Sequence, residues 1–101
     1  MIVEFSVVPL GKGESLSELV AKVADIVDRS GLPYKLTAMG TIVEGEWNEV
    51  FELIKECHSF IKRFAGRVLT TITVDDRDKA KGRIQGKVER IETILGRRLK
   101  T

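Results

Sequence analysis

The hydrophobic and polar positions of this chain change period along its length, and that change predicts the order of its elements. Near the N-terminus, Val3, Phe5 and Val7 occupy every second position, which is the period of a strand with one buried face. Residues 67–75, RVLTTITVD, are rich in β-branched side chains and predict a second long strand. The chain is therefore expected to begin with a strand and to carry another late in its length.

Three other segments have apolar residues at helical spacing and predict amphipathic helices. The first is expected to end at Ser30-Gly31, and its apolar side comprises Leu16, Leu19, Val20, Val23, Ile26 and Val27. The second, residues 46–64, directs inward Val50, Leu53, Ile54, Cys57, Ile61 and Phe64. The third ends at Gly96 and repeats Ile84, Val88, Ile91 and Leu95. Ser15 and Glu18 have the spacing of a capping box at the start of the first helix.

Residues 34–45 are too many for one ordinary strand and enough for a short hairpin. We expect strands at about 34–38 and 41–45, with a turn near Met39-Gly40. The resulting order is β-α-β-β-α-β-α. With right-handed crossovers, this order predicts one domain over residues 1–101, an α+β ferredoxin-like βαββαβ sandwich with an additional C-terminal helix. Two helices would cover one face of a four-stranded antiparallel sheet whose first and third strands are central.

Composition narrows the classes of protein to which this chain can belong. The 101 residues are 43% hydrophobic and 32% charged, which suits one compact domain and excludes a disordered chain. No apolar run approaches the roughly 20 residues that cross a bilayer, and Glu4 and Ser6 interrupt the only candidate for a signal peptide. Cys57 is alone, so an internal disulfide and a cysteine-rich zinc site are excluded. We expect a soluble protein of the reducing cytoplasm, with no membrane partner.

Charge is segregated along the chain although the net charge is only +2. Residues 79–101 carry eight Lys or Arg and two Glu, whereas residues 1–78 carry nine basic and thirteen acidic groups. The basic tail could contact phosphates, but Glu89 and Glu92 lie among its bases. A solvated or subunit-pairing helix face is the favoured interpretation. RNA recognition by the open sheet would need exposed aromatic residues on the central strands, and Phe5 is expected on the helix side. We expect no nucleic-acid partner.

One face of the sheet would remain open to water, a ligand, a partner or the third helix. Alternation places on it Ile2, Glu4, Ser6, Val8, Leu69, Thr71, Thr73 and Asp75. The facing of Thr37, Thr41 and Glu44 stays undecided, because Gly40 can shift the register of the hairpin. Two interpretations stay open: a polar pocket that orients a small ligand, and an ordinary solvated sheet face.

Signals for catalysis are weak. His58 adjoins Cys57 in sequence, and neighbouring side chains on a helix point apart, so the two do not form a nucleophile–base pair. Trp47 is expected to pack at the start of the second helix, with stacking on an aromatic ligand as the alternative. The sequence contains no paired-acid or metal-ligand pattern, so we expect no enzyme, no metal and no cofactor.

Several segments together resemble the small thiamine-binding (YkoF-like) family. They are MIVEFSVVPLG, MGTIVEGEW followed by a helix with Cys57-His58, TTITVDDR and KVERIETILG. The resemblance covers essentially the whole chain in the same order. It implies a ferredoxin-like subunit that assembles into dimers or tetramers and binds thiamine or its hydroxymethyl-aminopyrimidine part without catalysis. The alternative is a regulatory or structural oligomeric module that has no ligand.

The chemistry of that ligand selects candidate binding residues. An aminopyrimidine has an amine donor and ring-nitrogen acceptors, which carboxylates and hydroxyls can bind. We expect Ser6, Thr41 and Glu44 to orient the pyrimidine, with Glu4 in support. The thiazolium of thiamine is a fixed cation, favoured near Glu4 or Glu44 and near an aromatic face such as that of Trp47.

Overall fold

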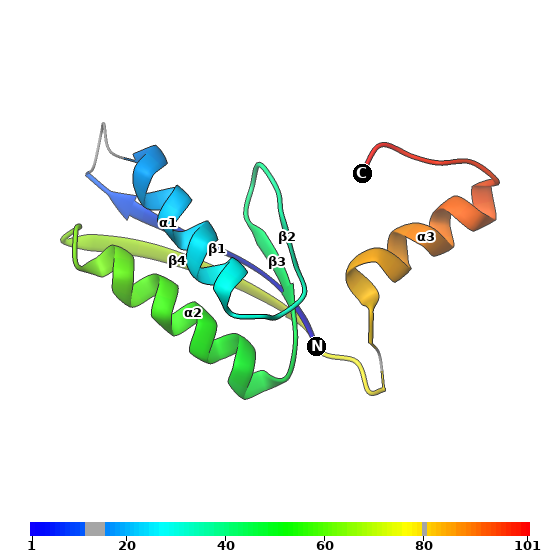
Figure 1. The fold of residues 1–101 in the computed structure, drawn as a ribbon, viewed down its shortest axis with the longest axis horizontal. Helices are drawn as coiled ribbons and strands as arrows, with labels where there is room; N and C mark the ends of the chain where they lie inside the picture. The colour runs from blue at the N-terminus through cyan, green and yellow to red at the C-terminus, as the bar shows by residue number, and fades with distance from the viewer. Residues whose placement is uncertain (12–15, 80) are drawn as a thin grey trace.

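A computed structural model describes residues 1–11, 16–79 and 81–101, and its elements follow the predicted order (Figure 1). The strands are β1 (Ile2–Leu10), β2 (Tyr34–Leu36), β3 (Thr41–Glu44) and β4 (Arg67–Asp75). The helices are α1 (Leu16–Arg29), α2 (Trp47–Lys62) and α3 (Arg83–Leu95). The capping box expected at Ser15 lies outside the described residues.

The sheet is antiparallel with strand order β2-β3-β1-β4, so the first and third strands are central, as predicted. β1 pairs with β4 along its whole length, from Ile2 opposite Asp75 to Leu10 opposite Arg67. It pairs with β3 only as far as Phe5, opposite Thr41. From Ser6 onward, no strand in the described part of the chain lies on the other side of β1. The architecture is the predicted ferredoxin-like sandwich with an added C-terminal helix.

The hairpin strands are shorter than predicted because the turn takes more residues. β2 ends at Leu36, and the Thr37 N–H donates to the carbonyl of Gly40 at 2.9 Å. The Thr37 hydroxyl also donates to that carbonyl, at 2.9 Å, and accepts from the N–H of Met39 and of Gly40. This local network satisfies the turn without a longer ladder.

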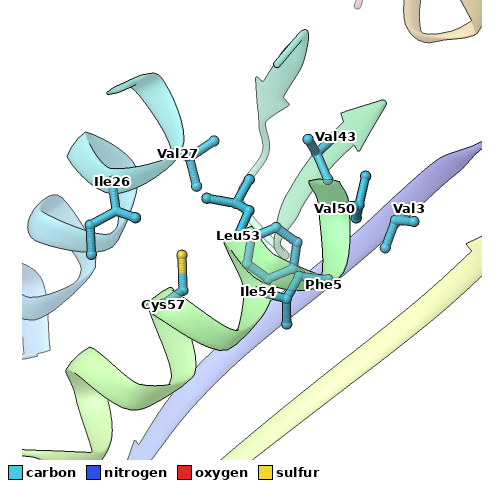
Figure 2. Close-up of a cluster of buried hydrophobic side chains, with 9 residues drawn as sticks. All are labelled: Val3, Phe5, Ile26, Val27, Val43, Val50, Leu53, Ile54 and Cys57. Atoms are coloured by element: carbon cyan, nitrogen blue, oxygen red, sulfur yellow. The ribbon is translucent and has the colours of Figure 1, made fainter. Parts of the chain in front are cut away.

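Helices α1 and α2 cover one face of the sheet and enclose the core (Figure 1). Figure 2 shows its buried cluster, which comprises Val3, Phe5, Ile26, Val27, Val43, Val50, Leu53, Ile54 and Cys57. Strand alternation and helical spacing therefore predicted the interior correctly for β1 and for most of α1 and α2. Burying each large apolar side chain contributes roughly 1.5–3 kcal/mol, so this cluster holds the two layers together.

Three apolar residues of the first two predicted helices, expected inside, are exposed. Leu16 and Val20 lie in the first half of α1, which extends past the end of β3 and so has less sheet beneath it. Phe64 follows the last residue of α2 and packs against Phe60, with ring centroids 5.2 Å apart. Helical spacing identified the apolar side correctly but could not show where the sheet below it ends.

The third helix contacts the sandwich at its start but otherwise stands apart from it. Figure 1 shows α3 standing apart from α1 and α2, and we call residues 83–101 the C-terminal arm. The Cα radius of gyration is 15.1 Å, whereas a compact chain of this length has about 13 Å. Arg83 is the one buried residue of α3, while Ile91, Ile94 and Leu95 are 50%, 74% and 50% exposed.

Gly40 lets the hairpin approach β1 closely, and replacing it should destabilise the protein. A Cβ at this position would lie 2.9 Å from the carbonyl oxygen of Phe5, a backbone atom that cannot move alone. We expect Gly40→Ala to lower the free energy of unfolding by about 1–3 kcal/mol, the usual cost of overpacking. Urea denaturation measures it.

Gly86→Ala is the matched control. Gly86 lies within α3, and a Cβ there meets no atom within 4 Å. Because alanine favours a helix interior by about 0.5–1 kcal/mol, this variant should be neutral or more stable. Equal stability of the two variants would contradict the steric role of Gly40.

Candidate functional site

The fold leaves a cavity where β3 ends before β1 does. We call it the hairpin cavity. Its volume is about 280 Å³, and its walls comprise Phe5, Ser6, Val7 and Val8 of β1, Val20, Val23 and Ala24 of α1, and Leu36, Thr37, Ala38, Met39, Gly40 and Thr41 of the hairpin. Most of the wall residues are apolar, and three of them, Ser6, Thr37 and Thr41, carry a hydroxyl. Such a combination is typical of a small-molecule site.

The three hydroxyls differ in what they already bind. That of Thr37 is engaged by the turn, as described above. Those of Ser6 and Thr41 form no hydrogen bond with another residue in the described ranges. Because each hydroxyl can donate once and accept twice, both can bind a polar ligand without breaking an existing contact.

The exposed backbone of β1 adds further polar groups beside the cavity. In an antiparallel strand, the N–H and C=O of alternate residues point to the same edge. Residues 6–10 pair only with β4 among the described strands, so this second edge presents donors and acceptors that no ladder uses. A flat ring with an amine and ring nitrogens fits such an edge, since it can donate and accept in one plane.

A separate polar cluster lies at the other end of β3, where the arm begins. The carboxylate of Glu44 accepts the backbone N–H of Arg83 at 3.0 Å. The guanidinium of Arg83 donates to Asp75 Oδ2 at 2.6 Å, and the Lys87 ammonium donates to the same oxygen at 3.0 Å. We call Glu44, Asp75, Arg83 and Lys87 the arm latch.

The latch replaces an ordinary helix cap. Gly82 occupies the N-cap position of α3 and has no side chain to accept a hydrogen bond. Glu44, 39 residues earlier, supplies the acceptor at the positive end of the helix dipole. The hydrogen bond from Arg83 and then that from Lys87 lower the pKa of Asp75 to about 2, against a small opposing effect of burial. The anionic form of Asp75 therefore holds the arm.

The five predicted binding residues do not meet in one place. Ser6 and Thr41 line the hairpin cavity. Glu4 is exposed on the open face, opposite Thr73 on one side and Ile42 on the other. Thr41 lies opposite Phe5 and so faces the helices.

The other two predicted residues lie at the far end of β3. Glu44 is three residues from Thr41, about 10 Å along an extended strand, and belongs to the arm latch. Trp47 is 56% exposed and packs against Phe51, with ring centroids 4.4 Å apart. Packing at the start of α2 was the interpretation favoured from sequence for Trp47.

Sequence reasoning missed most of the cavity wall, namely the hairpin residues 36–40 and the overhanging part of α1. The available signal was the difference in length between the first strand and the hairpin strands. A long strand beside a shorter one must extend past it, and this leaves a notch next to the longer strand. The alternation of single residues does not reveal such a notch.

The Cys57–His58 pair lacks the arrangement of a catalytic pair. Cys57 is buried in the core, and burial raises the pKa of its thiol to about 12. His58 Nδ1 shares a hydrogen bond of 2.6 Å with the Thr70 hydroxyl on β4. Within the ranges that the structure covers, no three His, Cys, Asp or Glu side chains are grouped to hold a metal ion. None of the helices described has the length and apolar character to span a membrane.

Comparison with known proteins identifies a family. The profile described as "Thiamine-binding protein" matches residues 3–92. A UPF0045 protein of Methanocaldococcus jannaschii is 33% identical over 91 residues, which are 90% of this chain and 91% of the relative. A UPF0045 protein of Mycobacterium bovis is 37% identical over 96 residues, 94% of each chain.

Solved structures agree with the fold. A crystal structure of the hypothetical Methanocaldococcus jannaschii protein superposes with a TM-score of 0.81 at 33% identity, covering 89% of this chain and 93% of that one. A Thermotoga maritima structure, described as that of a candidate thiamine biosynthesis/salvage protein, gives a TM-score of 0.78 at 26% identity, with 89% and 96% covered. Both support the ferredoxin-like architecture.

The arm latch predicts how Asp75 titrates. Its carboxyl should titrate at about pH 2, because its folded pKa lies below the unfolded value of about 4. The contribution of the latch is then complete above pH 4 and is lost as the pH falls through about 2. The carboxyl ¹³C shift of Asp75 against pH measures the midpoint.

Two glutamine variants distinguish the effect of the latch hydrogen bonds on the pKa of Asp75 from the effect of the positive charge of α3. Arg83→Gln should raise the pKa of Asp75 toward its ordinary value, because the first donor is lost. Arg90→Gln removes the same charge from α3 at a residue that forms none of the latch contacts, and should leave the midpoint near 2. Equal midpoints in the two variants would argue against the latch.

Proposed function

Because this chain belongs to the thiamine-binding protein family, we propose that it binds thiamine or its hydroxymethyl-aminopyrimidine part, as a non-catalytic oligomer. The observation that carries the proposal is the hairpin cavity, where two hydroxyls without partners in the described chain adjoin the unpaired edge of β1. The description of the Thermotoga maritima structure is consistent with the same ligand class.

In this proposal, the pyrimidine ring enters the hairpin cavity with its polar edge toward β1. The backbone edge and the Thr41 hydroxyl bind the amine and the ring nitrogens, and the Ser6 hydroxyl approaches the same edge from the open-face side of β1, while the side chains of α1 and the hairpin contact the ring faces. A volume of about 280 Å³ is near the lower limit for small-molecule sites, so it suits one ring better than the whole of thiamine. The thiazolium would extend past the rim, and the exposed carboxylate of Glu4 would favour its positive charge.

In this proposal, Glu44 and Trp47 contact the ligand only within an oligomer. Since they lie at the opposite end of β3, they reach a ligand only when it is bound to a second copy. Self-association itself has physical support, because neither the open face of the sheet nor the long outer edge of β4 is covered by another described element. Uncovered sheet edges and apolar faces favour pairing with another chain.

Calorimetric titration with thiamine, hydroxymethyl-aminopyrimidine and a thiazole-only compound tests the ligand. We expect saturable binding of the first two and none of the third. Ser6→Ala and Thr41→Val should each weaken binding about two- to tenfold, because a hydrogen bond contributes roughly 0.5–1.5 kcal/mol. Thr73→Val, which makes the same hydroxyl-to-methyl change on the open face, should bind as the wild type does.

The outcomes distinguish whether the protein binds a pyrimidine at all from whether it binds it in the hairpin cavity. If neither Ser6→Ala nor Thr41→Val weakens binding, the pyrimidine binds somewhere other than the hairpin cavity. No binding of any compound would contradict the proposal and favour the alternative, a regulatory or structural oligomer without a ligand. The exposed apolar arm is the specific observation that favours that alternative.

A further inference from the structure

The side chains that line the hairpin cavity are uncharged. Every wall residue named above is either apolar or carries a hydroxyl as its polar group. A phosphate monoester has a charge of about −1.5 to −2 at neutral pH, and proteins bind it with Arg or Lys side chains or with converging N–H donors. The described walls contain neither Arg nor Lys. Whether a ligand carries a phosphate close to its ring should therefore affect how well it fits this cavity.

The backbone beside the cavity has more acceptors than donors. The carbonyl of Phe5 points toward the hairpin, since a Cβ at Gly40 would lie 2.9 Å from its oxygen. Alternation along the strand directs the N–H and C=O of Val7 to the same edge, and then the C=O of Pro9. Proline has no N–H. One N–H between two carbonyls can bind an aminopyrimidine, but it cannot surround a phosphate.

The part of α1 beside the cavity is not an anion site. Its wall residues are Val20, Val23 and Ala24, all of which follow the first turn of the described helix. The N–H groups that a helix leaves free for an anion are those of its first turn. The N–H groups of these three residues are instead used within the helix.

The charged residue of the open face that lies beside the cavity is acidic. A Cβ at Gly40, a wall residue, would lie 3.7 Å from Glu4 Cγ. The bases of the same face are farther from the hairpin side of β1. Lys35 is separated from Glu4 by Ile42, which makes two strand spacings, about 10 Å. Arg67 lies on β4, across β1 from the hairpin.

We propose that the hairpin cavity selects pyrimidines whose ring methylene carries no phosphate. In hydroxymethyl-aminopyrimidine phosphate, one methylene and one ester oxygen join the phosphate to the ring, so the anion lies at the uncharged rim beside Glu4. In thiamine, the same methylene carries the thiazolium, and the hydroxyl that can be esterified lies beyond that second ring. The cavity therefore discriminates against the pyrimidine phosphate and tolerates thiamine phosphate. This inference rests on the proposed function and deepens it by naming the ligand class.

Calorimetric titration of the full chain with two pairs of compounds tests the selection. The pairs are hydroxymethyl-aminopyrimidine with its phosphate, and thiamine with thiamine phosphate. We expect the phosphate to weaken binding of the pyrimidine roughly tenfold or more, and binding of thiamine less than about threefold. Thiamine carries a larger group on the same methylene, so its binding would show that size does not cause the exclusion.

A lysine at the rim should reverse the exclusion. Val20 is a wall residue of α1 that is 53% exposed, so Val20→Lys can keep its stem on the rim and its ammonium in water. This variant should bind the pyrimidine phosphate roughly tenfold more tightly than the wild type does, because a hydrogen bond to a charged group forms. Ser59→Lys adds the same charge to the exposed surface of α2, outside the cavity wall, and should leave binding unchanged.

A second variant tests the carboxylate beside the rim. Glu4→Gln removes its charge and nearly keeps its shape. Thiamine should then bind about two- to fivefold more weakly, and the pyrimidine phosphate should gain a similar factor, as expected for exposed charges. Glu52→Gln makes the same change on the exposed surface of α2 and should alter neither affinity.

Three results would overturn the inference. If the pyrimidine and its phosphate bind equally well, the cavity does not select between them, while the proposed function stands. If thiamine phosphate loses as much affinity as the pyrimidine phosphate, the protein rejects phosphate wherever it is attached, and the role of the methylene position is wrong. If no compound of either pair binds, the proposed function fails together with the selection.

Discussion

The structure depends on the unequal pairing of its central strand. β1 pairs with β4 over nine residues but with β3 over only four, from Ile2 to Phe5. The shared length builds the sheet and aligns the apolar residues under α1 and α2. The unshared length leaves a backbone edge and a notch, which the hairpin turn and the overhanging half of α1 close into the hairpin cavity. One strand therefore supplies both the core and the candidate site.

The two sides of the sheet have separate physical roles. The helix side is apolar and buried, whereas the open side combines exposed β-branched residues with carboxylates. At one end of the open side, Glu44 and Asp75 anchor an arm whose outer turns have no partner in the described chain. A helix held at one end only, with exposed apolar side chains beyond the anchor, would gain stability if those side chains were covered, because an isolated helix of this length is marginal in water.

Period and composition were sufficient for the order of elements, the central strands and most of the core, because these follow from side-chain burial alone. The bounds of β4 were also predicted from its β-branched run. The sequence could not decide the facing of Thr41, which depends on how many residues the turn before it uses. Nor could it show that Glu44 caps a helix 39 residues later, since such a contact depends on tertiary geometry. The apolar spacing of α3 predicted the helix but could not show that its outer turns stand exposed.

The register of β3 is what keeps the cavity and the latch apart. A slip by one residue would turn Thr41 toward the open face and Glu44 toward the core, because side chains alternate along a strand. Glycines at both ends oppose such a slip. A Cβ at Gly40 would lie 2.9 Å from the Phe5 carbonyl, and one at Gly45 would lie 3.2 Å from Val50. The N-terminal Met1 ammonium and N–H of Gly45 add hydrogen bonds of 3.1 Å across the same end. Close packing at these two points thus assigns Thr41 to the cavity and Glu44 to the arm.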